Sequence, residues 1–262
     1  MEKQEELRVR VVQSDIIWED KEANLNHYND LLSNADDGNA DIIVLPEMYS
    51  TGFSMNVKQL AETTDGPTMK LAQSWAKQYN ASIIGSFIAQ EDGLYYNRGF
   101  AAMPNGKTYF YDKRHLFIGG EKQIFTPGDN HLTIAYKGWN IALCICYDLR
   151  FPVWLRNKDC AYDLMLCIAE WPSNRQYIFE HLLIARAIEN QSYVCACNRV
   201  GTDGNQLSYI GGSQLIDYKG KVKGRCTDNV EETRTFTLLK YPLESHREKV
   251  PVWKDADSFY WG

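Results

Sequence analysis

The stretch IALCICYDLRFP, residues 141–152, places a thiol where an apolar segment changes abruptly into a charged one. Alternation along a strand puts Cys144 and Cys146 on one face of a sheet, with Cys146 nearer the strand's end. If Pro152 lies in the first turn of a following helix, backbone N–H groups at that turn lower the pKa of the Cys146 thiol. We therefore predict that Cys144 is a small buried residue, and that Cys146 is either a nucleophile or a second core residue.

A second pair of cysteines with the same spacing, Cys195 and Cys197, raises the alternative of a zinc site built from four thiolates. Structural zinc sites usually space their cysteines more widely and on loops, whereas both pairs here lie in apolar segments typical of strands. The five histidines are scattered and form no ligand motif: His27, His115, His131, His181 and His246. We therefore expect no metal and no cofactor.

A thiol nucleophile needs a base and a group that stabilises an oxyanion, and two other segments offer them. Glu47 ends the apolar segment IIVLPE, and Lys113 ends YFYDK. Each charged group therefore has the strand-end position that we expect for Cys146, and active sites of α/β folds collect at strand ends. Either charge alone is typical of a solvated loop, but the three residues together predict a site with a base, a cation and a thiol.

The segments that must position these residues alternate between strands and helices. Apolar or alternating segments predict strands at 7–15, 40–47, 81–90, 94–103, 106–116, 139–148, 163–169, 192–198, 208–217 and 234–239. Apolar residues at helical spacing predict helices at 20–35 and 67–79, from about Pro152, and at 174–191. Because no linker rich in Pro, Gly or Ser interrupts this order, we expect one α/β domain spanning residues 1–262.

Composition excludes several classes of protein. The 262 residues are 44% hydrophobic and 24% charged, as in an ordinary globular protein, and the net charge of −6 argues against a nucleic-acid partner. No apolar run approaches the roughly 20 residues of a membrane helix, so we expect no membrane partner. The N-terminus has no apolar core of a signal peptide, and most of the seven cysteines lie in apolar runs. We therefore expect reduced thiols and a cytoplasmic location.

The segments LPEMYSTGF, YDKRHLF and CYDLRFP resemble the Glu, Lys and Cys motifs of the nitrilase superfamily of carbon–nitrogen hydrolases. The resemblance runs nearly end to end and includes VVQSDIIWED, TPGD, WPSNR, ARAIENQSYVCACNRVGTDG and the tail REKVPVWKDADSF. EMYSTGF, DKRHLF and the tail are most similar to the bacterial omega-amidase branch, which acts on monoamides of short dicarboxylates such as 2-oxoglutaramate. The resemblance implies an α/β four-layer α-β-β-α sandwich that dimerises through its helices, as a homodimer or higher homo-oligomer.

The same resemblance implies a cysteine amidase that releases the acid and ammonia through a thioester. Cys146 would attack the amide carbonyl, and Glu47 would carry the protons. The oxyanion would be held by Lys113 and by the backbone N–H of Tyr147. Glu121, in FIGGEKQIFTPGD, aligns with a second glutamate that the superfamily often places beside the lysine, where it would hold Lys113 or the substrate nitrogen.

A substrate with a distal carboxylate needs an arginine or backbone N–H donors in the pocket. Arg175 in WPSNR is a candidate, whereas we expect Arg150 in CYDLRFP to form a structural salt bridge with a nearby acid. Trp171 follows a predicted strand and is either a pocket wall or a core residue. Tyr49 and Phe53 follow Glu47 closely, so we expect them to cap the pocket.

Two kinds of protein remain as alternatives to an omega-amidase. Another hydrolase of the same superfamily, such as an N-carbamoyl-amine amidohydrolase or a nitrilase, would share all three motifs. A non-catalytic partner protein that keeps the fold would have lost the Glu, the Lys or the Cys, but all three positions are filled here.

Overall fold

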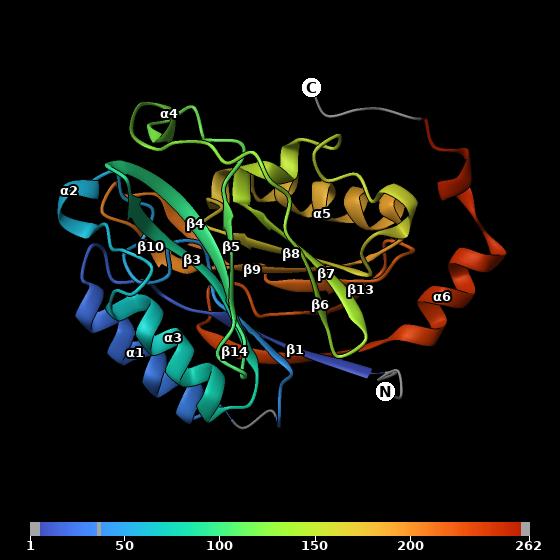
Figure 1. Cartoon of the computed structure of the whole chain (residues 1–262), viewed down its shortest axis with the longest axis horizontal. Helices are drawn as coiled ribbons and strands as arrows, with labels where there is room; N and C mark the ends of the chain where they lie inside the picture. The colour runs from blue at the N-terminus through green and yellow to red at the C-terminus, as the bar shows by residue number, and fades with distance from the viewer. Residues whose placement is uncertain (1–5, 36–37, 258–262) are drawn as a thin grey trace.

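The computed structural model of the chain describes residues 6–35 and 38–257 (Figure 1), so the last residues of the tail motif, 258 and 259, lie outside it. The described strands form two six-stranded mixed sheets and a two-stranded ribbon. The first sheet has the order β14 (Glu232–Leu239), β1 (Glu6–Gln13), β2 (Ile42–Val44), β3 (Ser82–Glu91), β4 (Leu94–Ala102) and β5 (Thr108–Asp112). The second has the order β13 (Val222–Arg225), β12 (Gln214–Ile216), β9 (Tyr193–Asn198), β8 (Leu164–Ala169), β7 (Trp139–Ile145) and β6 (Thr133–Tyr136). The ribbon pairs β10 (Val200–Thr202) with β11 (Ser208–Ile210).

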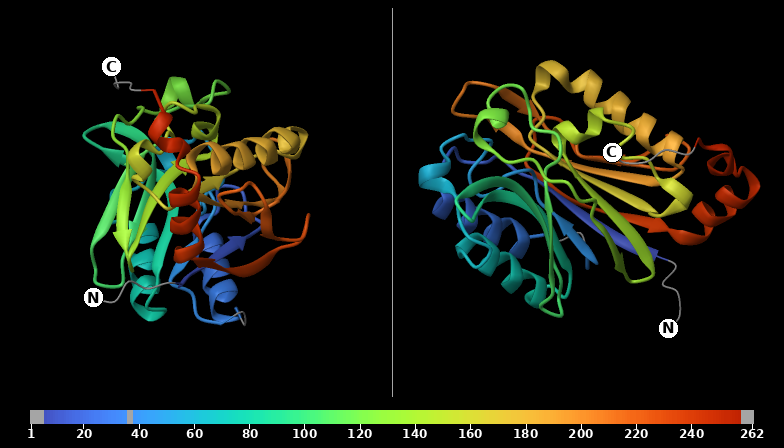
Figure 2. Two further views of the ribbon diagram at one scale, coloured as in Figure 1. Left: turned by 90° about the vertical axis from the view of Figure 1, so that its right-hand side faces the viewer. Right: turned by 45° about the horizontal axis from the view of Figure 1, so that its top comes forward.

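Helices cover the outer faces of the two sheets, as Figure 2 shows. The first sheet is covered by α1 (Lys21–Ser33) and α3 (Pro67–Gln78), and the second by α5 (Gln176–Asn190). The remaining helices are α2 (Val57–Leu60), α4 (Glu121–Ile124) and the C-terminal α6 (Lys240–Lys249). This arrangement confirms the predicted four-layer α-β-β-α sandwich. Among the described residues, no helix combines the length and the apolar composition that crossing a bilayer requires.

The strands of the first sheet are apolar on both faces because both faces are covered. In β1, Val11 packs into the cluster between the sheets, whereas Val12 packs toward α1 and α3. In β3, Ile84 likewise packs into the cluster between the sheets, whereas Ile83 packs toward the covering helices. Since successive side chains of a strand point to opposite faces, the unbroken apolar runs predicted from the sequence are the signature of this double burial.

The parallel strands bring the candidate residues to one end of the sandwich. β1, β2 and β3 run parallel in one sheet, and β7, β8 and β9 run parallel in the other. Glu47 follows the end of β2, Lys113 follows β5 directly, and Cys146 follows β7 directly. The loops after the strands therefore build the site, as expected for an α/β fold.

The predicted helix beginning near Pro152 is wrong. The chain instead forms a single 3₁₀ turn, η1 (Cys146–Arg150), and Pro152 lies outside any helix. The turn is stabilised by a side chain, since the Asp148 carboxylate accepts from the backbone N–H of Ile145 at 3.1 Å. A capping carboxylate inside the turn replaces the longer helix that the proline suggested.

Two other predicted elements differ in their bounds. The segment 208–217 is not one strand, because Gly211 and Gly212 adopt φ values of +84° and +76° and separate β11 from β12. Positive φ is the conformation that glycine adopts without strain, and the break sends the two strands into different sheets. The helix predicted at 174–191 begins with a 3₁₀ turn, η3 (Ser173–Arg175), before α5. Sequence patterns did not predict β6, β10, β13 or α6.

Candidate active site

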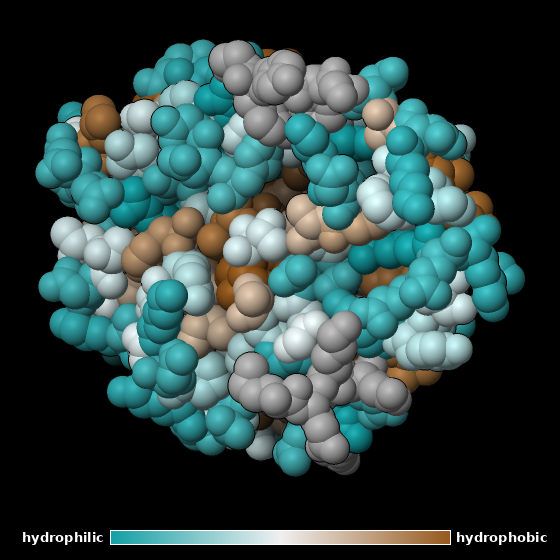
Figure 3. All heavy atoms as spheres, turned by 45° about the vertical axis from the view of Figure 1, so that its right-hand side comes forward, coloured by the Kyte–Doolittle hydropathy of each residue, from teal (hydrophilic) through white to brown (hydrophobic). Residues whose placement is uncertain are grey.

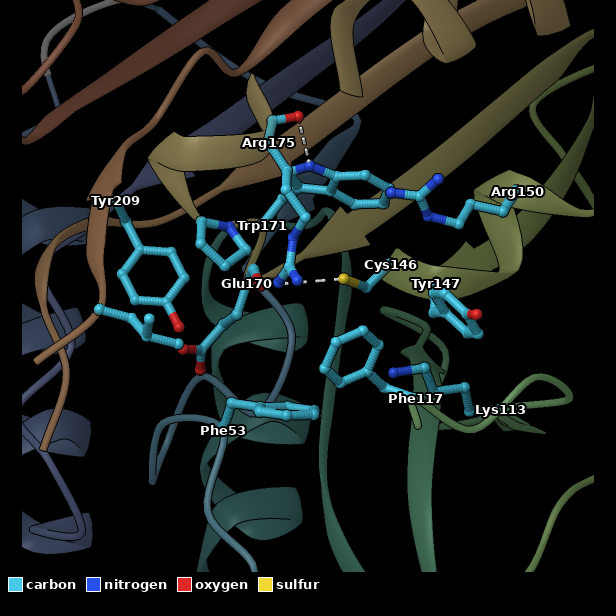
Figure 4. A pocket seen from close by; sticks show the side chains of 12 residues that line it. Phe53, Lys113, Phe117, Cys146, Tyr147, Arg150, Glu170, Trp171, Arg175 and Tyr209 are labelled. Atoms are coloured by element: carbon cyan, nitrogen blue, oxygen red, sulfur yellow. Dashed lines mark hydrogen bonds between the residues drawn. The ribbon is translucent and has the colours of Figure 1, made fainter. Parts of the chain in front are cut away.

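Cys146 occupies a strained position at the junction of β7 and η1. Its φ is +45°, in the left-handed region that residues with a side chain seldom adopt. The bend directs its sulfur into a pocket, where Sγ lies 3.9 Å from the carbonyl oxygen of Glu170 (Figure 4). Cys144, two residues earlier in β7, is fully buried and pairs in register with Cys167 of β8. The prediction that Cys144 is a small buried residue is confirmed.

The carboxylate of Glu47 and the ammonium of Lys113 form a fully buried ion pair beside Cys146. Lys113 Nζ donates to Glu47 Oε1 and to Glu121 Oε2, each at 2.8 Å. Asn97 Nδ2 donates to Glu47 Oε1 at 2.7 Å and to Glu121 Oε1 at 3.0 Å. The expected contact of Glu121 with Lys113 is therefore present, and Asn97 connects the two carboxylates.

The second oxygen of Glu47 and the backbone around it complete this cluster. The N–H of Glu170 donates to Glu47 Oε2 at 3.0 Å, and the N–H of Phe117 donates to Glu121 Oε2 at 2.7 Å. Because backbone groups of two separate loops hold these carboxylates, both side chains are fixed before any substrate enters. Fixed, buried charges interact far more strongly than the same charges in water.

Burial and neighbouring charge set the protonation states in the cluster. Burial raises the pKa of the Cys146 thiol well above its ordinary value, the Glu47 carboxylate adds to this rise, and Lys113 opposes it. Burial alone lowers the pKa of Lys113, but Glu121 and Glu47 outweigh burial and raise it. Burial raises the pKa of Glu121, against the opposing effect of Lys113. At neutral pH the cluster therefore contains a protonated thiol and a charged lysine.

The pocket above Cys146 is lined by aromatic and charged side chains (Figure 4). Besides Cys146 and Lys113, its lining includes four predicted residues: Phe53, Tyr147, Trp171 and Arg175. Trp171 is held in place on two sides: its N–H donates to Asn198 Oδ1 at 2.8 Å, and its Nε1 donates to the carbonyl of Arg175 at 2.9 Å. The structure supports both alternatives for Trp171, because its side chain lines the pocket and is also buried in the core, where it stacks on Phe179.

Arg150 lines the same pocket, so the expectation of a structural salt bridge is wrong. Its guanidinium lies 5.1 Å from the ring centroid of Trp171 and forms no ion pair with an acid of the described residues. Arg175 lies 5.0 Å from the ring centroid of Phe117 and likewise has no acidic partner in that part of the chain. The turn at Cys146 points Arg150 back over the pocket, which spacing along the sequence did not reveal.

Tyr49 does not cap the pocket, contrary to the expectation. Its side chain is fully buried on the other side of the first sheet, where its ring packs against Tyr28 and Trp75. Its hydroxyl donates to the carbonyl of Thr68 in α3 at 3.1 Å. Tyr49 is therefore a core residue between the sheet and its covering helices, and closeness to Glu47 in sequence was misleading.

Several residues of the site were not predicted from the sequence: Asn97 and Glu170 beside Glu47, and Phe117, Pro172, Leu207 and Tyr209 in the pocket lining. Asn97 lies in the middle of β4, and the only signal was a polar residue inside an apolar strand. Glu170 directly follows β8, the same strand-end position that identified Glu47, and it lines the pocket. Because Glu170 follows a buried strand as Glu47 does, its position at a strand end was a usable signal in the sequence.

The two C-x-C pairs do not converge on a metal-binding arrangement in the described part of the chain. Cys195 and Cys197 lie in β9 and Cys144 in β7, with β8 between these strands. Among the described residues, no group of three or more His, Cys, Asp or Glu side chains could hold a metal ion. Strand alternation therefore accounts for the spacing of these cysteines.

Comparisons with known proteins agree with the geometry. The model of the carbon–nitrogen hydrolase family matches residues 8–240. The chain is 39% identical to omega-amidase YafV of Escherichia coli K12, over 97% of this chain and 98% of the relative. It is 34% identical to 2-oxoglutaramate amidase of Bacillus subtilis strain 168, over 82% of this chain and 85% of the relative.

Solved structures show the same fold. XC1258 from Xanthomonas campestris, described as a CN-hydrolase superfamily protein with an arsenic adduct in its active site, is 39% identical, with a TM-score of 0.95. That match covers 99% of this chain and 100% of the other. Nit3 of Saccharomyces cerevisiae, a nitrilase superfamily member at 22% identity, shares the fold with a TM-score of 0.82 over 95% and 96% of the two chains. The chain therefore belongs to the carbon–nitrogen hydrolase family, as its motifs predicted, and it is a hydrolase of carbon–nitrogen bonds.

Proposed function

We propose that this protein is a cysteine-dependent amidase that hydrolyses the omega-amide of short dicarboxylate monoamides to the acid and ammonia. Suitable substrates are 2-oxoglutaramate, 2-oxosuccinamate and succinamate. The observation that carries the proposal is that one pocket combines the Cys146 thiol, Lys113 with its buried partner Glu47 behind it, and two arginines. The names of the relatives from Escherichia coli and Bacillus subtilis support the same substrate class.

Glu47 acts first as a general base in the proposed mechanism. Because burial and Glu47 raise the pKa of Cys146, the thiol is protonated at rest and must lose its proton as it attacks. Glu47 takes that proton while Sγ forms a bond to the amide carbon. The developing oxyanion is stabilised by Lys113 and by the backbone N–H of Tyr147, in a buried setting where such stabilisation is strongest.

Glu47 then acts as an acid and again as a base. Its proton goes to the nitrogen as the C–N bond breaks, which releases ammonia and leaves a thioester on Cys146. A water molecule gives a proton to Glu47 and attacks the thioester carbon, and the C–S bond breaks. The proton returns to the sulfur, so the acid leaves and the resting thiol is restored. Glu121 and Asn97 keep Lys113 and Glu47 in position throughout these steps.

Arg150 and Arg175 select the distal carboxylate in this proposal. Both guanidinium groups line the pocket, each packs over an aromatic ring, and neither is paired with an acid of the described residues. Guanidinium groups bind carboxylates with two parallel hydrogen bonds, and aromatic packing keeps them oriented. A short chain between the amide and the carboxylate would span from Cys146 to these arginines.

A panel of matched compounds tests the proposed function. We expect the purified protein to release ammonia from 2-oxoglutaramate and succinamate, but not from an N-carbamoyl amine or a short nitrile. The alternatives within the superfamily, an N-carbamoyl-amine amidohydrolase and a nitrilase, predict activity on those two compounds instead. Absence of ammonia from every omega-amide would contradict the proposal.

We also propose that the chain acts as one domain and assembles as a homodimer or higher homo-oligomer in the cytoplasm. One apolar cluster joins residues of both sheets, which supports a single folding unit. Figure 3, turned toward the α6 side, shows apolar side chains gathered around a hollow on an otherwise hydrophilic face, which supports association. The seven cysteines form no disulfide, which favours a reducing compartment.

A further inference from the structure

Glu170 is part of the reaction centre through its backbone, but the mechanism leaves its side chain unused. Its N–H binds Glu47, and its carbonyl oxygen lies 3.9 Å from Cys146 Sγ. Figure 4 shows the side chain running away from Cys146, toward Tyr209 and Phe53 on the far wall of the pocket. The carboxyl group therefore lies on a different part of the pocket wall from Cys146.

The carboxyl group of Glu170 is buried with only one of its oxygens paired. Oε2 accepts from Arg199 Nη1 at 3.3 Å, whereas Oε1 has no hydrogen-bond partner among the described residues. Arg199 also has other partners, since its Nη2 donates to Asp15 Oδ1 at 3.1 Å and to the carbonyl oxygen of Ile16 at 2.9 Å. Buried polar atoms are nearly always paired, so an unpaired oxygen on a residue that lines the pocket points to a ligand atom.

The surroundings of this carboxyl group favour its neutral form. Burial raises the pKa of Glu170 to about 8, and the Glu47 carboxylate adds to the rise, whereas Arg199 and the backbone N–H of Phe53 oppose it. The nearest charged and titratable groups are Arg199, Glu47 and Tyr209. Asp15 binds Arg199, and Asp203 binds Tyr209. The other titratable groups of the pocket are Cys146, Lys113, Arg150 and Arg175. A protonated carboxyl group at neutral pH has an O–H to donate.

We propose that Glu170 is a specificity-determining residue that donates a hydrogen bond to an oxo group beside the distal carboxylate of the substrate. The inference rests on the proposed function, because that function places the amide at Cys146 and the carboxylate at the arginines. A carbonyl oxygen on the carbon next to the carboxylate accepts a hydrogen bond from the O–H of Glu170, whereas a methylene group leaves that O–H unpaired. An ammonium group at that carbon would meet a neutral carboxyl and two positive charges, which disfavours amino acid amides.

Two substrates that differ only in the oxo group test this inference. 2-Oxosuccinamate and succinamate share chain length, amide and carboxylate, so the ratio of their kcat/KM values isolates recognition of the oxo group. We expect wild type to prefer 2-oxosuccinamate, and Glu170→Leu to reduce that preference about 10-fold, as loss of one buried hydrogen bond does. Glu170→Gln keeps an N–H donor and should keep most of the preference. Leu207→Ala, a control on the same pocket without a polar group, should change both substrates together.

The pH dependence gives a second readout that needs no variant. Glu170 loses its proton as the pH rises through about 8, so the wild-type preference for 2-oxosuccinamate should fall between about pH 7 and pH 9. In Glu170→Gln the preference should stay constant across that range, because an amide does not titrate there. This readout still decides the question if Glu170→Leu, which leaves Arg199 with one acid fewer, fails to fold.

The outcomes separate the inference from the proposed function. If wild type hydrolyses both substrates and Glu170→Leu slows both equally, the role of Glu170 is refuted while the amidase stands. A preference that stays constant with pH in wild type also refutes the donor role. If wild type hydrolyses neither substrate, the proposed function fails first and the role of Glu170 fails with it.

Discussion

Two carboxylates and one ammonium share a buried space beside the thiol, and Asn97 makes this combination possible. Glu47 and Glu121 both bind Lys113, so without further donors one negative charge in the cluster would be incompletely compensated. Asn97 donates one hydrogen bond to each carboxylate. A buried ion pair is stable only when further hydrogen bonds satisfy the carboxylate oxygens and N–H groups that do not take part in the pair. Asn97 is thus a positioning residue that acts through Glu47 and Glu121.

Replacing Asn97 should therefore impair turnover more than binding. We expect Asn97→Ala to lower kcat by about 10- to 100-fold, as loss of hydrogen bonds to charged groups does, with little change in KM. KM should be spared because Asn97 does not line the pocket. Steady-state kinetics with succinamate measure both constants. Asn105→Ala, in the exposed turn between β4 and β5, is the matched control and should behave like wild type. A raised KM with an unchanged kcat would contradict the positioning role.

At this scale, the sequence predicted the residues that lie at strand ends and missed those whose neighbours come from elsewhere in the chain. Glu47, Lys113 and Cys146 share one kind of position, which composition and strand length reveal. The role of Asn97 depends on two carboxylates that lie 50 and 24 residues away in sequence. Tyr49 shows the opposite error, because nearness in sequence to Glu47 carried no information about which face of the sheet it occupies.

Among the elements, the turn after β7 was predicted wrongly, because a proline alone does not determine where a helix begins. Pro152 is compatible with a helix start, yet the chain turns earlier, at Cys146. The Asp148 carboxylate holds this turn: it accepts from the Tyr111 hydroxyl at 2.7 Å and from the backbone N–H of His115 at 2.9 Å. Both donors come from the neighbourhood of Lys113. Tertiary contacts therefore select the turn, and the same contacts link the thiol and the lysine.

Strands and long helices were predictable because burial imposes a period on their sequences. β1, β3, β4, β8 and β9 lie close to their predicted ranges, since each presents a run of apolar or alternating residues. β6 and β13 are short edge strands with few buried residues, so they carry little signal. The pair Gly211–Gly212 was included in one strand although two successive glycines are a turn signal.

For the whole molecule, α5 offers a surface through which two copies can associate. Tyr177, His181, Ile184 and Ile188 follow one another at helical spacing and form one face of α5. Tyr177 is 72% exposed and Ile188 51% exposed, although both side chains are mostly apolar. An exposed apolar stripe on a helix is typical of an interaction surface. This placement agrees with association through helices, which the family resemblance implied.

A charge placed on this face should therefore weaken the oligomer. One chain has a mass of 30.2 kDa, so a homodimer sediments as a species of about 60 kDa, twice that value. We expect Ile188→Glu to shift the population toward the single chain. Leu94→Glu is the control: Leu94 is 47% exposed, but it lies at the start of β4, away from α5. Wild type that sediments only near 30 kDa would contradict the proposed assembly.

The central claim, that Cys146 and not Cys144 attacks the substrate, is tested most directly by removing each thiol in turn. Ammonia release from succinamate should fall by about 10⁴-fold or more in Cys146→Ala, as happens when a catalytic nucleophile is lost. Cys144→Ala should retain most of the activity, because Cys144 is a buried side chain in β7 that does not line the pocket. Thermal unfolding should show both variants folded. An inactive Cys144→Ala together with an active Cys146→Ala would contradict the account.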